Sequence, residues 1–227
     1  MEPLYSTVFG PCGIGDHTLA EISGPPNSGK SLVLQQLIAH CALPYRFGGR
    51  QWKVFLISLS HKITRESLGK VVRAELQAFS KGEGEPPAEE ELTEIAMQCI
   101  GRVSFIKCSS TADVKYTLSN IPFVELVAMD TLGEFYWLDA AAGNHNVTKY
   151  RYYRQYQGYL DRICKTEMMV CGMYTVDSRF VNSRYNEEIP GAKIDYKLEL
   201  RPRGRVFMNR MPLSFRNGII EISQEAD

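Results

Sequence analysis

Short apolar runs alternate along the chain with segments whose apolar residues recur at helical spacing. The apolar runs predict buried strands at residues 18–23, 54–57, 103–106, 124–129 and 168–173. Helical spacing follows Lys30 and recurs near 64–80 and from about 111. After about 194, polar and apolar residues alternate between tight turns, which predicts antiparallel strands that extend one sheet edge. We therefore expect an α/β fold, a mainly parallel sheet flanked by helices with a C-terminal antiparallel extension.

Length and composition favour one domain. The chain has 227 residues, of which 44% are hydrophobic, which is ample for a single shared core. We expect residues 1–227 to form that domain, with a lead-in at 1–17 and an acidic loop at 82–94. The sequence has neither a membrane-spanning apolar run nor the features of a signal peptide, which predicts a soluble, intracellular protein. Six scattered cysteines without a C-x-x-C pair predict buried thiols, not a zinc site.

Residues 24–31, Gly-Pro-Pro-Asn-Ser-Gly-Lys-Ser, form a complete G-x-x-x-x-G-K-S phosphate-binding loop between a predicted strand and a predicted helix. In such a loop, backbone N–H groups at the helix N-terminus converge on the phosphates. Lys30 is expected to reach the β- and γ-phosphates, and the Ser31 hydroxyl to ligate Mg²⁺. We predict that ATP and Mg²⁺ are the cofactors. The predicted nucleotide-binding residues are Gly24, Asn27, Ser28, Gly29, Lys30 and Ser31.

A second nucleotide motif follows about a hundred residues later. The apolar run 124–129 leads directly into Asp130, which is how a Walker B carboxylate is placed near a phosphate loop and its Mg²⁺. We predict that Asp130 joins Ser31 in the metal site, although on its own an aspartate after a strand also fits a simple turn cap. A hydrolase further needs a group that orients or deprotonates water. Residues 58–62 hold no carboxylate, so we predict no catalytic residue and very low ATP hydrolysis.

These motifs, with segments 101–110 and 130–139, resemble the eukaryotic recombinase paralogues of the RecA superfamily over nearly the whole chain. The resemblance implies a RecA-like P-loop ATPase core without the N-terminal helical domain of full-length recombinases. In that family a catalytic glutamate falls at about Ser60 and a γ-phosphate-sensing glutamine near Thr175. Because both residues differ here, the resemblance implies weak or structural ATP binding.

The resemblance also implies a biological setting. It predicts a nuclear, non-motor subunit that acts in DNA repair by homologous recombination and assists the loading of a recombinase on single-stranded DNA. The expected partner is another recombinase paralogue, of the D type, in a hetero-oligomer away from membranes. The residues also allow a second hypothesis, that the protein is an independent P-loop kinase or ATPase acting on a small molecule.

Two loops face DNA in this family, and they fall here at about 139–148 and 177–193. The first loop contains no Lys or Arg, whereas the second mixes basic and aromatic residues suited to phosphate contact and base stacking. Its acidic residues, Asp177, Glu187 and Glu188, offset this basic charge, so we expect weak DNA binding by this chain alone. The candidate DNA-binding residues are Arg179, Phe180, Arg184, Tyr185 and Lys193. An ordinary surface loop is the alternative.

Charge and aromatic spacing refine this picture. Residues 1–144 carry 12 Lys or Arg and 16 Asp or Glu, whereas residues 145–227 carry 14 and 10. A polyanion should therefore meet the C-terminal part, unless the acidic loop accounts for the difference. A tyrosine-rich segment has one apolar stripe at helical spacing, which predicts a face packed on the sheet, formed by Tyr152, Tyr156, Tyr159 and Ile163.

Overall fold

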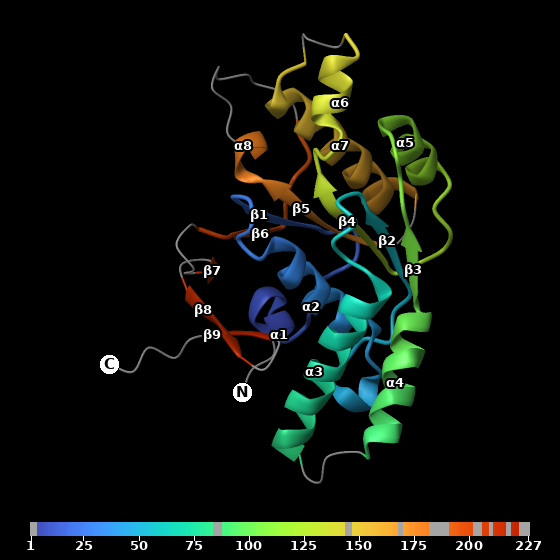
Figure 1. Cartoon of the computed structure of the whole chain (residues 1–227), viewed down its shortest axis with the longest axis vertical. Helices are drawn as coiled ribbons and strands as arrows, with labels where there is room; N and C mark the ends of the chain where they lie inside the picture. Colours follow the sequence, from blue (N-terminus) through green and yellow to red (C-terminus); the bar gives the residue numbers. More distant parts are fainter. Residues whose placement is uncertain are drawn as a thin grey trace.

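The computed structural model describes residues 4–83, 88–143, 147–167, 170–181, 191–201, 206–208, 211–216 and 219–222. A six-stranded sheet of order β3-β2-β4-β5-β1-β6 crosses the molecule, and its described strand pairs are parallel (Figure 1). Its strands are β1 (Leu19–Gly24), β2 (Val54–Ser58), β3 (Val103–Ile106), β4 (Leu126–Leu132), β5 (Cys171–Asp177) and β6 (Tyr196–Glu199). This confirms the predicted α/β class and fits a RecA-like core.

Helices cover both faces of the sheet (Figure 1). On one face lie α1 (Leu4–Phe9), α2 (Lys30–Ala42), α3 (Arg65–Glu83) and α4 (Glu89–Gly101), with the short 3-10 helix η1 (Tyr45–Phe47). On the other lie α5 (Thr111–Ser119), α6 (Tyr136–Ala141), α7 (Lys149–Arg162) and α8 (Ser178–Val181), with the π-helical turn η2 (Ile163–Glu167) after α7. Strands buried on both faces must be apolar at nearly every position, which explains the continuous apolar runs of the sequence.

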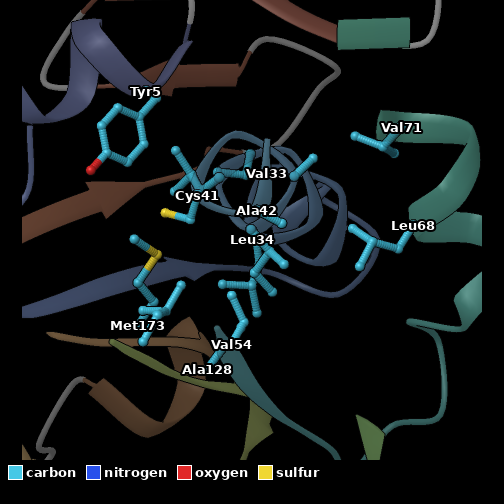
Figure 2. Close-up of a cluster of buried hydrophobic side chains, with 14 of the residues drawn as sticks. Tyr5, Val33, Leu34, Cys41, Ala42, Val54, Leu68, Val71, Ala128 and Met173 are labelled. Carbon is cyan, nitrogen blue, oxygen red and sulfur yellow. The ribbon is translucent and has the colours of Figure 1, made fainter. Parts of the chain in front are cut away.

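The core around α2 fixes the helix that follows the phosphate loop. Figure 2 shows α2 surrounded by side chains from other elements, including Tyr5 of α1, Leu68 of α3 and Met173 of β5. Leu34 of α2 is fully buried, as are Leu68 and Met173. Burial of this kind stabilises by roughly 1.5–3 kcal/mol for each large side chain. The N-terminus of α2 is therefore held in place by the packing of the whole helix.

A buried polar network ties α7 to the strand that leads into the phosphate loop. Glu21 of β1 is 0% exposed, and its Oε2 accepts hydrogen bonds from the Tyr153 hydroxyl at 2.5 Å and the Tyr174 hydroxyl at 2.7 Å. Gln157 donates to both hydroxyls, at 2.7 and 2.9 Å, and Lys197 Nζ lies 3.7 Å from Glu21 Oε1. Burial raises the pKa of both tyrosines, so they remain protonated donors. These contacts compensate the cost of burying the carboxylate.

The predicted packing face of α7 is confirmed, with one addition. Tyr152, Tyr156 and Ile163 are buried, and Tyr159 packs half-buried against the same cluster. Tyr153 is buried too, and its hydroxyl donates a hydrogen bond to Glu21. A helical stripe of apolar residues could not reveal that contact, because Glu21 lies on a distant strand.

Three strand predictions need correction. β4 continues beyond Asp130 to Leu132, and β5 begins at Cys171 and ends at Asp177, so both strands lie further along the chain than predicted. β6 pairs with β1 in parallel, not antiparallel. The antiparallel strands are β7 (Val206–Met208), β8 (Met211–Arg216) and β9 (Ile219–Ile222), which form a separate sheet. Alternation of polar and apolar residues indicates that one face of a strand is exposed. It does not indicate whether the neighbouring strand runs parallel or antiparallel.

The acidic loop expected at 82–94 is largely helical. α3 extends to Glu83, and α4 begins at Glu89 with three acidic residues in its first turn. Negative side chains are stabilised there by the partial positive charge of the helix N-terminus. Glu89 and Glu91 also lie 3.5 Å from Arg73 and 3.6 Å from Arg46. The acidic residues thus begin a helix that packs beside α3.

The cysteines follow the prediction of buried thiols with one exception. All six are free thiols, and five are buried; Cys12 is the exposed one. Burial raises the pKa of Cys99 to about 11 and that of Cys171 to about 12. These thiols are therefore protonated at neutral pH and serve as small core residues.

Candidate nucleotide-binding site

The phosphate loop connects the end of β1 to the start of α2, and its two glycines serve different purposes. Gly29 has φ +90°, and a Cβ on it would meet nothing within 4 Å, so its backbone conformation alone requires glycine. A Cβ on Gly24 would lie 2.7 Å from Ser28 Oγ and 2.8 Å from the Leu200 carbonyl, so there the close approach of other chain segments excludes a side chain. Asn27 takes φ 59°, which asparagine tolerates well.

Lys30 folds back over the loop. Its Nζ donates to the carbonyl oxygens of Gly24 at 2.9 Å and Pro25 at 2.6 Å. Burial lowers the pKa of Lys30, and the charges of Lys62 and Arg179 lower it further, whereas Asp177 and Asp130 oppose the shift. The ammonium is thus bonded to two loop carbonyls, either of which it can exchange for a phosphate oxygen.

Asp130 joins the second motif to the first. Ser31 Oγ lies 2.9 Å from Asp130 Oδ1 and 3.1 Å from Oδ2, and the aspartate is 0% exposed. Two further hydroxyls donate to the same carboxylate: Ser60 Oγ to Oδ2 at 2.7 Å and Thr175 Oγ1 to Oδ1 at 2.6 Å. Hydrogen bonds from α2, β5 and the segment after β2 therefore fix this buried carboxylate beside the loop.

Ser60 and Thr175 occupy the positions where the resemblance places a catalytic glutamate and a sensing glutamine. Both hydroxyls are directed at Asp130, and the backbone N–H of Ser60 also donates to the Asp130 carbonyl at 3.0 Å. A serine hydroxyl at neutral pH does not accept a proton as a carboxylate does. The side chains at these two positions thus hydrogen-bond to the Asp130 carboxylate and do not supply a catalytic base.

The residues of the loop fit a phosphate and a cation. Ser28 Oγ is buried and has no hydrogen-bond partner among the described residues, so it is an available donor inside the loop. Ser31 Oγ gives its proton to Asp130, which leaves its lone pairs for a cation. The described part of the chain holds no cluster of three or more His, Cys, Asp or Glu side chains that could bind a metal alone. Mg²⁺ commonly needs few protein ligands, because nucleotide phosphates and water complete its coordination.

The DNA-binding candidates are distributed differently from the prediction. Phe180 is only 6% exposed, and its ring lies edge-on to Tyr136 with centroids 5.4 Å apart. The stacking role predicted for Phe180 therefore does not fit its place in the core. Lys193 is on the surface, with its side chain 81% exposed and its Nζ 3.3 Å from Asp195. Arg184 and Tyr185 lie outside the described residues.

Arg179 forms an ion pair with Asp177, whose position beside the phosphate loop was not predicted from the sequence. The Asp177 carboxylate accepts from Arg179 Nε at 3.0 Å and from Nη2 at 2.9 Å. Asp177 is the last residue of β5 and is paired in register with Gly24 at the end of β1. The apolar run that continues to Val176 was the available signal, since it places Asp177 at the same edge of the sheet as the loop.

A small cavity of about 150 Å³ lies away from the loop, among α5, α6 and α7. Three of its polar lining residues are joined by hydrogen bonds. The Thr111 and Tyr152 hydroxyls both donate to Asp139 Oδ2, at 2.5 and 3.0 Å. This cavity was not predicted from the sequence.

Comparison with known proteins gives an informative similarity. No protein-family model matches the chain. The chain is 28% identical over 134 residues to the DNA repair protein XRCC2 of Mus musculus, and the match covers 56% of this chain and 44% of that protein. The chain thus matches less than half the length of this curated relative. The similarity supports a relationship to the RecA-like recombinase paralogues.

No helix among the described residues has the length and hydropathy needed to cross a membrane.

Proposed function

We propose that this chain is an ATP-binding, non-motor subunit of a nuclear assembly that repairs DNA by homologous recombination. The observation that carries the proposal is the geometry around Asp130, where a phosphate-loop serine and two further hydroxyls share one buried carboxylate. The similarity to a DNA repair protein supports the setting in recombination.

The loop would hold the nucleotide through residues 24–31. Backbone N–H groups at the start of α2 would face the phosphates, and Lys30 would exchange the Gly24 and Pro25 carbonyls for phosphate oxygens. Ser31 would ligate Mg²⁺, with Asp130 acting through water. When bound, Mg²⁺ supplies positive charge that balances the phosphates.

Turnover is expected to be very slow. A water molecule near the terminal phosphate needs a base or an orienting group, and Ser60 and Thr175 are both committed to Asp130. ATP would then stabilise an interface instead of driving a motor. In RecA-like assemblies the nucleotide lies at the junction of two subunits, which suits a subunit with this role.

The partner we propose is another recombinase paralogue, of the D type, in a hetero-oligomer that contacts single-stranded DNA. Lys193 offers an exposed charge for phosphate contact, and the candidates Arg184 and Tyr185 lie between it and α8 in the sequence. One neutral subunit has little net attraction for a polyanion, so the assembled complex should bind DNA more tightly than this chain alone.

A pull-down tests the proposal. Tagged wild-type chain, Lys30→Ala and the surface control Lys70→Ala are incubated with nuclear extract with and without ATP, and bound proteins are identified by mass spectrometry. We expect the wild type and Lys70→Ala to capture a recombinase paralogue, with ATP strengthening the capture, and Lys30→Ala to lose the ATP effect. Light scattering that showed long homopolymers of this chain with ATP would contradict the proposal.

A further inference from the structure

An ion pair stands at the edge of the phosphate loop. Asp177 receives Arg179 Nε at 3.0 Å and Nη2 at 2.9 Å, and its Oδ1 also accepts the Arg179 backbone N–H at 2.9 Å. The two side-chain bonds hold the guanidinium in one orientation, and the third bond holds the Asp177 carboxylate against the Arg179 backbone. The bonds to Asp177 come from Nε and Nη2, so the Nη1 donors can bind another anion.

Sheet register places this pair next to Lys30. Asp177 is the register partner of Gly24, and neighbouring strands lie about 4.8 Å apart. The Gly24 carbonyl is itself bonded to Lys30 Nζ at 2.9 Å. α8, which carries Arg179, also contacts β1 and is drawn beside it in Figure 1. The Lys30 ammonium and the Arg179 guanidinium therefore lie at the same end of the sheet, and the pKa of Lys30 responds to both Asp177 and Arg179.

The backbone beneath Arg179 is anchored while its side chain remains accessible. Phe180, the next residue, is buried, and a Cβ on Gly133 would come within 3.0 Å of its ring. The Arg179 side chain is 60% exposed, whereas that of Asp177 is 14% exposed. Anchored backbone, fixed orientation and open donors are what a residue needs to receive a phosphate without a large rearrangement.

We propose that Arg179 binds the terminal phosphate of ATP and that Asp177 is its positioning residue; this inference rests on the proposed ATP binding. Thr175, on the same strand, donates its hydroxyl to Asp130 and so is not directed at the nucleotide. Arg179 is the next cationic side chain beyond the strand end. A guanidinium makes directional, charge-assisted hydrogen bonds with phosphate oxygens. The site would thus distinguish a triphosphate from a diphosphate without hydrolysing it.

Calorimetric titration with ADP and with the non-hydrolysable β,γ-imido analogue of ATP, both with Mg²⁺ and without DNA, tests the inference. We expect Arg179→Ala to bind the analogue about tenfold more weakly, with ADP affinity nearly unchanged. Arg179→Lys should lose a smaller part of this preference, because it retains charge but lacks the planar fork. Arg73→Ala, which removes another exposed ion-paired arginine, should match the wild type.

A double-mutant cycle tests Asp177 separately. Asp177→Asn should reduce the preference for the analogue when Arg179 is present and leave the preference unchanged in the Arg179→Ala background. A purely structural role of Asp177 would change the affinities for both nucleotides in either background, which would overturn its assignment.

The outcomes separate this inference from the proposed function. Equal losses of ADP and analogue affinity in Arg179→Ala, or no loss of either, would overturn the role of Arg179 while leaving nucleotide binding intact. Failure of the wild type to bind either nucleotide would overturn the proposed function itself. Thermal unfolding of each variant, monitored by circular dichroism, shows whether the fold is retained.

Discussion

The Ser31 hydroxyl donates to the Asp130 carboxylate, at 2.9 Å from Oδ1 and 3.1 Å from Oδ2. The two residues are 99 positions apart in the sequence, yet in the sheet only β5 separates β4 from β1, the strand that leads into the loop. Because Asp130 is fully buried, its hydroxyl donors replace the water that would otherwise solvate the carboxylate. The serine that we propose as a Mg²⁺ ligand is thus oriented by the fold itself.

Removal of the Asp130 carboxylate should destabilise the protein and weaken binding of Mg·ATP. Asp130→Ala leaves the hydroxyls of Ser31, Ser60 and Thr175 without their acceptor, so we expect a loss of about 2–4 kcal/mol in the free energy of unfolding. Urea unfolding measures this loss. Asp113→Ala, at an exposed carboxylate, is the control, and equal stabilities of the two variants would refute the structural role of Asp130.

The variant Ser60→Ala tests whether Ser60 only hydrogen-bonds to Asp130 or also takes part in ATP hydrolysis. The variant removes one of the hydroxyls bound to Asp130 and should lower the free energy of unfolding by about 1 kcal/mol. The slow rate of ATP turnover should not change, because Ser60 supplies no base. A steady-state ATPase assay checks this, and a turnover reduced to the background of Lys30→Ala would show that Ser60 takes part in hydrolysis.

His40 should make stability depend on pH. Its ring stacks on Tyr5 with centroids 4.2 Å apart and is 7% exposed, and burial, reinforced by Arg50, lowers its pKa from 6.5 to about 4. Between these two values the unfolded chain binds more protons than the folded one, so stability falls as pH decreases through this window. From pH 7 to pH 5 we expect His40 to account for a loss of about 2 kcal/mol.

Urea unfolding at both pH values measures that contribution. His40→Phe, which retains an aromatic ring beside Tyr5, should lose this share of the pH dependence. His61→Gln, at an exposed histidine, should retain it. An unchanged pH dependence in His40→Phe would show that His40 is not the responsible group.

Basic residues after β5 should contribute to DNA binding by the assembled complex. Arg184→Ala combined with Lys193→Ala removes two cations, and each phosphate contact on single-stranded DNA contributes about 0.7 to the salt slope. We expect weaker binding at low salt and a slope shallower by about one to two units. Fluorescence anisotropy over a range of salt concentrations measures the affinity and the salt slope. An unchanged slope would show that these residues belong to an ordinary surface loop that does not contact DNA phosphates.

Sequence patterns predicted the features of this fold that depend on local chemistry. The phosphate loop and the aspartate after an apolar strand are short motifs, and they led directly to Ser31 and Asp130. The parallel pairing of β6 and the burial of Tyr153 depend on partners far along the chain, β1 and Glu21, which periodicity does not reveal. The position of Asp177 beside the phosphate loop was not predicted for a related reason, because it depends on the register of Asp177 with Gly24.

The measurement that tests the central claim most directly follows ATP on the purified chain. Radiolabelled Mg·ATP is added to the wild type and to Lys30→Ala, with and without single-stranded DNA, and bound nucleotide is separated and identified over time. We predict that the wild type retains nucleotide that is recovered mainly as ATP, that DNA does not accelerate its conversion, and that Lys30→Ala retains none. Rapid, DNA-stimulated conversion to ADP, or equal retention by Lys30→Ala, would contradict the assignment of a nucleotide-binding, non-motor subunit.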